Sequence, residues 1–139
     1  MTIPNDLIDK CERNQYCWHR ETPSDIDVAF EKLGLPKTGE LYIFARKYCL
    51  QFASESIPFQ LVDIVEDDGT ISDNIYYARE ELKIEPTLVP ISTYEAESIL
   101  VVDVNDERVL QLTPNDAGDA WISEIISPSL YSFMLSHLP

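Results

Sequence analysis

Apolar residues recur at three- and four-residue spacing near both ends of the chain, which is the period of amphipathic helices. One helix is predicted from Asn5 to about Tyr16, with a thin apolar stripe. A closing helix is predicted to begin with Ser127 as its N-cap and Pro128 in its first turn. The apolar face of this closing helix, expected to pack on a sheet, is formed by Leu130, Phe133, Met134 and Leu138.

Two further helices are predicted before residue 53. One covers residues 24–33, where Ser24 and Asp27 form a near capping box and Gly34 suits a left-handed C-cap. The next is expected to begin at an N-cap provided by Thr38. The apolar faces of these two helices are expected to hold Ile26, Ala29, Phe30, Leu33, Leu41, Ile43, Phe44, Tyr48 and Phe52.

The pattern then changes to short apolar and β-branched runs separated by turn residues. Asn105-Asp106 is predicted to form a tight hairpin turn, because both residue types tolerate positive φ. Residues 66–69 are a predicted turn as well, and residues 71–82 fit a helix better than a strand. Strands are predicted over residues 59–65, 87–91, 97–104, 107–113 and 121–126.

This order of elements predicts an α+β fold. N-terminal helices and a C-terminal helix are expected to pack on one face of a mostly antiparallel sheet. The length of 139 residues predicts a single domain over residues 1–139. No apolar run approaches the roughly 18 residues of a membrane span, and the first ten residues lack the apolar core of a signal peptide. We therefore expect a cytoplasmic protein.

Charge changes the picture of function. The chain carries 10 Lys and Arg against 25 Asp and Glu, a formal net charge of −15. Residues 1–50 hold seven basic and eight acidic side chains, whereas residues 51–139 hold three and seventeen. Nucleic-acid and membrane-surface binding are disfavoured, because both need a basic surface. The acidic portion is either a surface that favours solubility or a face for a basic partner.

The residues that most often carry chemistry form no familiar motif. Cys11, Cys17 and His19 do not have the spacing of a zinc site, so inert thiols are expected. Neither His19 nor His137 belongs to a recognisable catalytic pattern, and no P-loop is present. We expect no enzyme activity, no cofactor and no metal.

The run Asp63–Ile71 invites a calcium interpretation. Aligning Gly69 with the invariant glycine of an EF-hand loop puts Ile64 and Ile75 at the first and last ligand positions, where carboxylates are required. A charged turn is therefore the preferred interpretation.

Aromatic residues near the acidic portion are candidate anchors for a partner. At most one of the adjacent Tyr76 and Tyr77 can face a core, so the other is expected to be exposed. Trp18 and Trp121 are expected to be core residues.

The central helical region resembles the SUKH superfamily, a group named partly for yeast cell-wall assembly regulators. Its members typically carry a helix ending in Glu-x-x-Leu-Gly, then Leu-Pro, then a helix with aromatic and apolar residues. This chain has Glu31, Leu33-Gly34 and Leu35-Pro36 in that order, followed by Leu41, Tyr42, Phe44 and Tyr48. Ser132-Phe133 with Leu135 and Leu138 is similar to the C-terminal pattern of the family. The resemblance covers about residues 24–138.

The resemblance implies a non-enzymatic role. Bacterial members are widely viewed as immunity proteins that bind and neutralise a toxin, often a nuclease, in the cytoplasm. A carboxylate surface suits such a partner, because nucleases have basic clefts and opposite charges speed association. The expected partner is a basic protein toxin, bound by a monomer or weak dimer. Candidate contacts are Glu66, Asp67, Asp68, Asp73, Tyr76, Tyr77, Glu80, Glu81, Asp103, Asp106 and Glu107.

A second hypothesis is an acidic cytoplasmic chaperone for a secreted effector. Such proteins share the size and low pI of this chain, about 4.2. They bind an extended segment of the effector in apolar grooves. A hydrolase of unknown type is a weaker third hypothesis.

Overall fold

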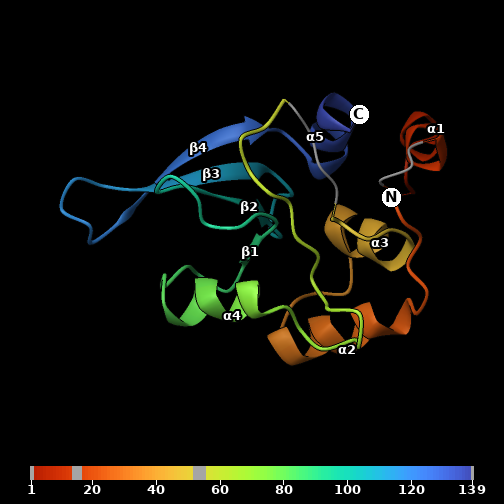
Figure 1. Ribbon diagram of the computed structural model, residues 1–139, viewed down its shortest axis with the longest axis horizontal. Helices are drawn as coiled ribbons and strands as arrows, with labels where there is room; N and C mark the ends of the chain where they lie inside the picture. The colour runs from red at the N-terminus through yellow and green to blue at the C-terminus, as the bar shows by residue number, and fades with distance from the viewer. Residues whose placement is uncertain (1, 14–16, 52–55, 139) are drawn as a thin grey trace.

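The computed structural model describes residues 2–13, 17–51 and 56–138 (Figure 1). Within these residues four helices precede one sheet and a fifth follows it. The helices are α1 (Asn5–Arg13), α2 (Ser24–Leu33), α3 (Glu40–Lys47), α4 (Asp73–Glu80) and α5 (Leu130–His137). No helix among the described residues is long and apolar enough to cross a membrane. The predicted end of the first helix at Tyr16 and the predicted core residue Phe52 lie outside the described residues.

The sheet is an antiparallel meander in the order β1-β2-β3-β4. Its strands are β1 (Leu88–Pro90), β2 (Ile99–Asp103), β3 (Val109–Pro114) and β4 (Trp121–Ser127). Val89 lies opposite Val102, and Val101 lies opposite Leu110. The predicted α+β fold, with helices packed on an antiparallel sheet, is therefore confirmed. Figure 1 shows β4 at the end of the sheet next to α5, and β1 at the end nearer α4.

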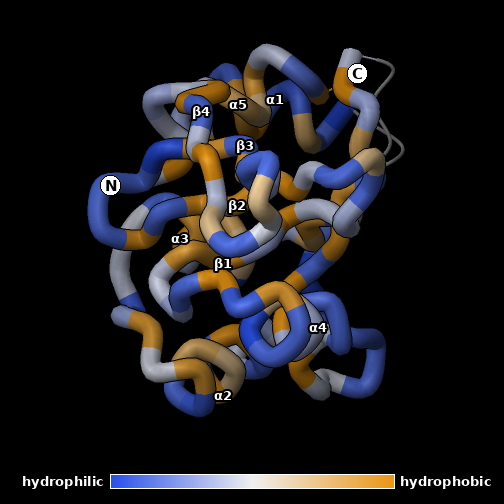
Figure 2. The backbone as a smooth tube through the Cα atoms, turned by 90° about the vertical axis from the view of Figure 1, so that its left-hand side faces the viewer, coloured by the Kyte–Doolittle hydropathy of each residue, from blue (hydrophilic) through white to orange (hydrophobic). Residues whose placement is uncertain are grey.

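Both faces of β2, a central strand of the sheet, are buried. Leu100, Val102 and Val109 join the larger core with α1, α2, α3 and α5. Alternate residues such as Val101 and Leu110 face a smaller core that includes Ala78 of α4. α4 therefore contributes to both cores, because its Ile75 belongs to the larger core and its Ala78 to the smaller one. β2 is a continuous apolar run, without the alternation that a strand with one buried face would show. This two-sided burial explains that pattern. Figure 2 shows the predominantly hydrophobic β2 inside the molecule and mostly hydrophilic positions along α4.

The helix ends are set by backbone geometry more than by the predicted caps. Pro23 occupies the N-cap of α2 without a side-chain cap bond, so the predicted capping box at Ser24 is wrong. Gly39, with φ of 92°, precedes α3 in place of Thr38. Ser129 caps α5 by accepting the N–H of Ser132, two residues after the predicted start. The prediction for Gly34 is confirmed, because its φ is 70° and its N–H donates to the Glu31 carbonyl.

The predicted strand over residues 59–65 is wrong. This segment makes only isolated bridges, between Leu61 and Ser92 and between Val65 and Ile71. Two backbone hydrogen bonds, from Val62 to Ile91 and from Thr93 to Gln60, still hold it beside the chain that follows β1. The segment does not form a continuous strand because the carboxylate of Asp63 turns away to a buried ion pair with Arg20.

The β2–β3 turn differs from the predicted two-residue hairpin. The residue with positive φ is Glu107, at 68°, and neither Asn105 nor Asp106 adopts such a conformation. A longer turn results, closed by the hydrogen bond from Asp103 N–H to the Arg108 carbonyl. This conformation lets the Glu107 carboxylate accept the Glu40 N–H at 2.6 Å, so Glu107 caps the N-terminus of α3 across 67 residues of sequence.

Glu40, in the first turn of α3, is buried with 7% of its surface exposed. Burial and the charge of Glu107 raise the pKa of its carboxyl group above the usual value. A raised carboxyl pKa means that the folded state favours the protonated form. The free energy of unfolding therefore falls as the pH rises through that pKa.

Glu40→Gln is therefore expected to be more stable than the wild type at pH 7.5, with the difference shrinking as the pH falls toward 4. Thermal unfolding across this pH range measures the difference. Glu31→Gln is the control, because the Glu31 side chain is 74% exposed. A variant whose Tm stays equal to that of the wild type at pH 7.5 contradicts this account of Glu40.

Candidate functional site

The candidate site is an open cleft between the segment that precedes α2 and the segment 59–67. Its volume is about 960 Å³. Several apolar side chains of the second segment line it, Phe59, Leu61 and Val65 among them. The two segments come from distant parts of the sequence, and one ion pair joins them.

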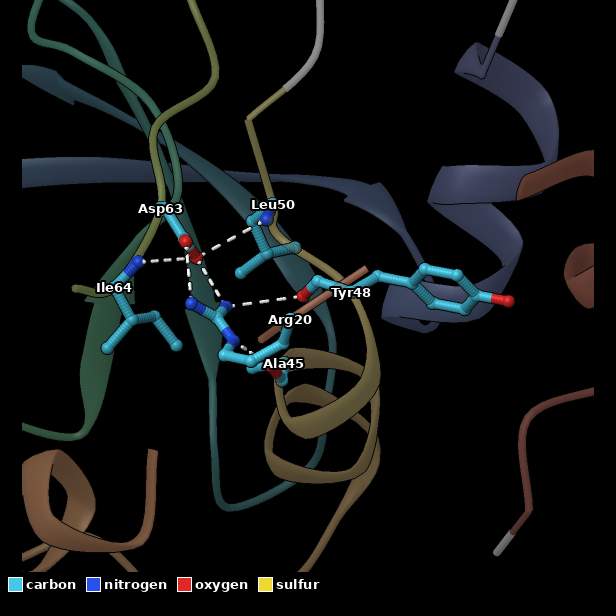
Figure 3. Close-up of polar contacts among 6 residues, drawn as sticks. All are labelled: Arg20, Ala45, Tyr48, Leu50, Asp63 and Ile64. Atoms are coloured by element: carbon cyan, nitrogen blue, oxygen red, sulfur yellow. Dashed lines mark hydrogen bonds and ion pairs between the residues drawn. The ribbon is translucent and has the colours of Figure 1, made fainter. Parts of the chain in front are cut away.

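Arg20 and Asp63 both line the cleft and form that ion pair. Figure 3 shows the hydrogen bonds between them. The guanidinium donates to both carboxylate oxygens, at 2.7 and 2.8 Å. Only 5% and 9% of the two side chains are exposed. The remaining donors of Arg20 reach the carbonyls of Ala45 and Tyr48, on and just after α3. Four of the five N–H groups of the guanidinium thus donate to protein oxygen, so Arg20 has a structural role.

Asp63 is equally well satisfied. One of its oxygens also accepts the backbone N–H of Ile64 at 2.9 Å and that of Leu50 at 3.3 Å. Figure 3 shows these bonds converging on the carboxylate from two directions. A buried charge needs such partners, because an unpaired one costs several kcal/mol (about 3–5). The pair therefore fixes the floor of the cleft.

Uncompensated carboxylates line the cleft around this pair. Glu21, Asp25, Glu66 and Asp67 line it together with Arg20 and Asp63, so five carboxylates face one arginine, a formal net charge of −4. Glu21, Glu66 and Asp67 are exposed. We call this site the acidic cleft, defined by these six residues and Trp18.

The turn that carries Glu66 and Asp67 is tightly built. Gly69 N–H donates to the Glu66 carbonyl at 2.9 Å. Gly69 has φ of 84°, and a Cβ there would lie 3.0 Å from the carboxylate of Asp25. Glycine is thus required both by the turn and by its approach to α2. Asp68 accepts two hydrogen bonds from Thr70, which lower its pKa. Asp68 therefore stabilises the turn and does not line the cleft.

Trp18 lines the cleft with 68% of its surface exposed, which corrects its predicted place in the core. The backbone of residues 18–20 runs alongside the end of α3: Cys49 N–H donates to the Trp18 carbonyl and Arg20 N–H to the Lys47 carbonyl, both at 2.8 Å. His19 pairs with Tyr48 between them. This pairing turns Arg20 into the protein and leaves the neighbouring Trp18 outside. Trp121, the other tryptophan, is half-buried and packs against Tyr94.

The site is suited to a cationic group. Carboxylates attract a lysine or arginine side chain, and the indole face of an exposed tryptophan binds such a cation by about 0.5–2 kcal/mol. Among residues 2–13, 17–51 and 56–138, no three His, Cys, Asp or Glu side chains are grouped to hold a metal ion. The exposed carboxylates and Trp18 of the cleft offer charge and aromatic contact to such a cation.

A second group of predicted contacts forms one face of α4. Asp73, Tyr76, Tyr77 and Glu80 follow helical spacing and are all exposed, the two tyrosines at 43% and 46%. Glu81 follows at the C-cap and is exposed too. Ser72 caps this helix and also lines the acidic cleft. The α4 face and the acidic cleft therefore adjoin.

The third group of predicted contacts is occupied by local structure. Asp103 accepts the N–H of Asn105 at 2.9 Å. Asp106 lies 2.6 Å from Arg108, and Glu107 caps α3 as described above. These three residues of the β2–β3 turn shape the turn itself. Within the part of the chain that the structure describes, the exposed Glu66 and Asp67 side chains make no such hydrogen bond or ion pair.

The two histidines make separate local contacts. His19 Nε2 lies 2.9 Å from a carboxylate oxygen of Glu12, whose other oxygen accepts the Tyr48 hydroxyl at 2.7 Å. These hydrogen bonds lower the pKa of Glu12. His137 Nδ1 lies 2.7 Å from the Ser56 hydroxyl, outside the acidic cleft, and its ring packs on Phe133.

Sequence reasoning missed Trp18, Glu21 and Asp25 as members of the site. Counting charge by region hid the two carboxylates, because residues 1–50 are almost neutral in sum. In the fold the nearby basic residues pair with other carboxylates and do not neutralise Glu21 and Asp25. Arg20 forms an ion pair with Asp63, and Arg46 lies 3.3 Å from Asp27. One signal in the sequence could have indicated that Trp18 is exposed. Trp18 is followed by the polar stretch 19–23, and a core tryptophan rarely has such neighbours.

Comparison with known proteins adds no neighbour. No protein-family model, curated protein or solved structure matches this chain. The resemblance to the SUKH superfamily therefore stays a prediction that rests on the motifs of the sequence.

Proposed function

We propose that this chain is a non-enzymatic immunity protein that binds a basic protein toxin and neutralises it by covering its cationic surface. The acidic cleft carries the proposal: five carboxylates face one arginine that is already paired, beside an exposed Trp18. Such a surface attracts a basic protein over long range and offers an aromatic anchor at short range.

A nuclease is the toxin class that fits best. The active site of a nuclease holds Lys and Arg to bind phosphate, and a rigid set of carboxylates competes for those cations. The resemblance of residues 24–138 to the SUKH superfamily supports the same class of toxin and an encounter in the cytoplasm. The α4 face would widen the contact, because it adjoins the cleft at Ser72.

Co-expression with a basic nuclease toxin, taken from a toxin-like gene next to that of this chain, tests the proposal. The wild type is expected to restore growth and to co-purify with the toxin. Trp18→Ala is expected to weaken the purified complex about tenfold or more, as loss of a central aromatic anchor does. Val28→Ala is the matched control, because Val28 is 50% exposed on α2 and does not line the cleft. A folded wild type that neither binds nor rescues contradicts the proposal.

An effector chaperone is the second candidate. The apolar lining of the cleft, from Phe59 to Val65, favours it, since chaperones hold extended segments against apolar surface. The two candidates differ in the state of the partner that they bind. An immunity protein binds the folded toxin domain, whereas a chaperone binds an unfolded segment of its effector and loses affinity when that segment folds.

A further inference from the structure

β4 is an edge strand with exposed isoleucines on both faces. Ile122 is 59% exposed and Ile125 is 58% exposed. Ile122 lies opposite Thr113 of β3, and Ile125 lies opposite Leu110. Thr113 and Leu110 point to opposite faces of the sheet, so the two isoleucines do as well. Ile126 is 37% exposed. Among the described residues, β4 pairs with β3 on one side and with no strand on the other. Its outer row of backbone N–H and C=O groups is therefore available for pairing.

The features that usually protect an edge strand are scarce here. Residues 121–127 contain no lysine and no proline. The irregularity in the pairing with β3 lies near the end of the strand, between Val109 and Leu110, and residues 121–125 keep a regular register. The opposite edge of the sheet differs, because residues 60–62 cover the chain beside β1 with backbone hydrogen bonds. Seven residues of open edge span roughly 23 Å.

Charge indicates which occupant suits this edge. In a chain that is 25% charged, residues 120–138 hold Glu124 and no other Asp, Glu, Lys or Arg. A basic partner is drawn to the carboxylates of the cleft and α4, not to this nearly neutral surface. Two copies, each with a net charge of −15, can approach most closely where neither carries charge.

The sequence of β4 also allows two copies of this strand to pair with each other. In an antiparallel pair of β4 strands with a two-fold axis at Ser123, Trp121 lies opposite Ile125 of the second copy and Ile122 lies opposite Glu124. No like charges are directly opposed in this register, and an aromatic residue meets a β-branched one. We propose that the chain forms a two-fold dimer in which two β4 edges join the sheets of both copies. The acidic cleft, beside β1, stays open in such a dimer.

Sedimentation equilibrium over a concentration series tests the dimer. The wild type is expected to approach twice the 15.9 kDa mass of one chain. Ile125→Lys is expected to weaken self-association at least about tenfold, because it places a charge in the joined sheet. Val28→Lys makes the same change of charge at an exposed apolar site on α2 and should leave the dimer unchanged. Circular dichroism checks that both variants fold.

Salt separates this contact from binding at the cleft. Raising NaCl from about 0.05 M to about 0.5 M screens the repulsion between two acidic copies, so the dimer should strengthen. A mass of one chain at every concentration overturns the proposal. So does an Ile125→Lys variant that dimerises like the wild type, or an assembly that keeps growing beyond two copies, since a two-fold contact closes on itself.

Discussion

Asp63→Ala is expected to lower the free energy of unfolding by about 3–5 kcal/mol, because it leaves the Arg20 guanidinium buried without its counter-ion. Two backbone N–H groups, of Leu50 and Ile64, lose their acceptor at the same time. A loss of this size is a large fraction of the roughly 5–15 kcal/mol that stabilises a typical domain. Urea denaturation followed by circular dichroism measures it.

Two further variants separate the charge from the shape of this pair. Asp67→Ala removes an exposed carboxylate from the same segment and should change stability by no more than about 0.5 kcal/mol. The double change Arg20→Met with Asp63→Leu removes both charges and should cost less than Asp63→Ala alone, since no charge is then left unpaired. If Asp63→Ala stays within about 1 kcal/mol of the wild type, the ion pair does not fix the floor of the cleft.

The double variant Glu66→Lys with Asp67→Lys is expected to weaken binding of the toxin at least about a hundredfold, equal to roughly 2.7 kcal/mol. Both side chains are exposed members of the acidic cleft, so their replacement brings its formal net charge from −4 to zero without removing packing. Isothermal titration calorimetry with the purified toxin measures the change. The loss of affinity should also abolish growth rescue on co-expression.

The matched control is Asp9→Lys with Asp116→Lys. It changes the net charge by the same amount at exposed sites on α1 and in the β3–β4 loop, outside the cleft. This control should bind the toxin within about threefold of the wild type, because distant exposed charges are screened beyond about 10 Å. Equal losses in both double variants would mean that net charge alone, without the cleft, governs binding.

Local patterns predicted the elements whose stabilising contacts are close in sequence. The apolar spacing of residues 24–33 and the conformation of Gly34 depend on neighbours within one helix, and both are confirmed. The continuous run Ile99–Val102 predicted β2 for the same reason. The closing helix was also found, although its cap lies at Ser129 instead of Ser127.

The predictions were wrong where contacts between segments distant in sequence determine the conformation. Residues 59–65 have the composition of a strand, yet Asp63 turns toward Arg20, 43 positions away, and only isolated bridges form. The β2–β3 turn bends so that Glu107 can cap α3. Trp18 is exposed because its neighbour Arg20 takes the buried position. A single sequence cannot indicate which distant partner a charged side chain will find.

The candidate site was predicted in part for the same reasons. The excess of acid after residue 50 pointed correctly to exposed carboxylates at residues 66–67 and along α4. It could not separate them from Asp103, Asp106 and Glu107, whose carboxylates are used within the fold. The opposite wall of the cleft comes from residues 18–25, where pairing of the basic side chains leaves acid exposed.

The dissociation constant of the toxin complex as a function of salt is the most direct test of the central claim, that the acidic cleft recognises a cationic partner. For the wild type it should rise steadily from about 0.05 M to about 0.5 M NaCl, because screening weakens contacts between opposite charges. For Glu66→Lys with Asp67→Lys it should be weak at every salt concentration and change little. A wild-type dissociation constant that does not depend on salt would contradict the account.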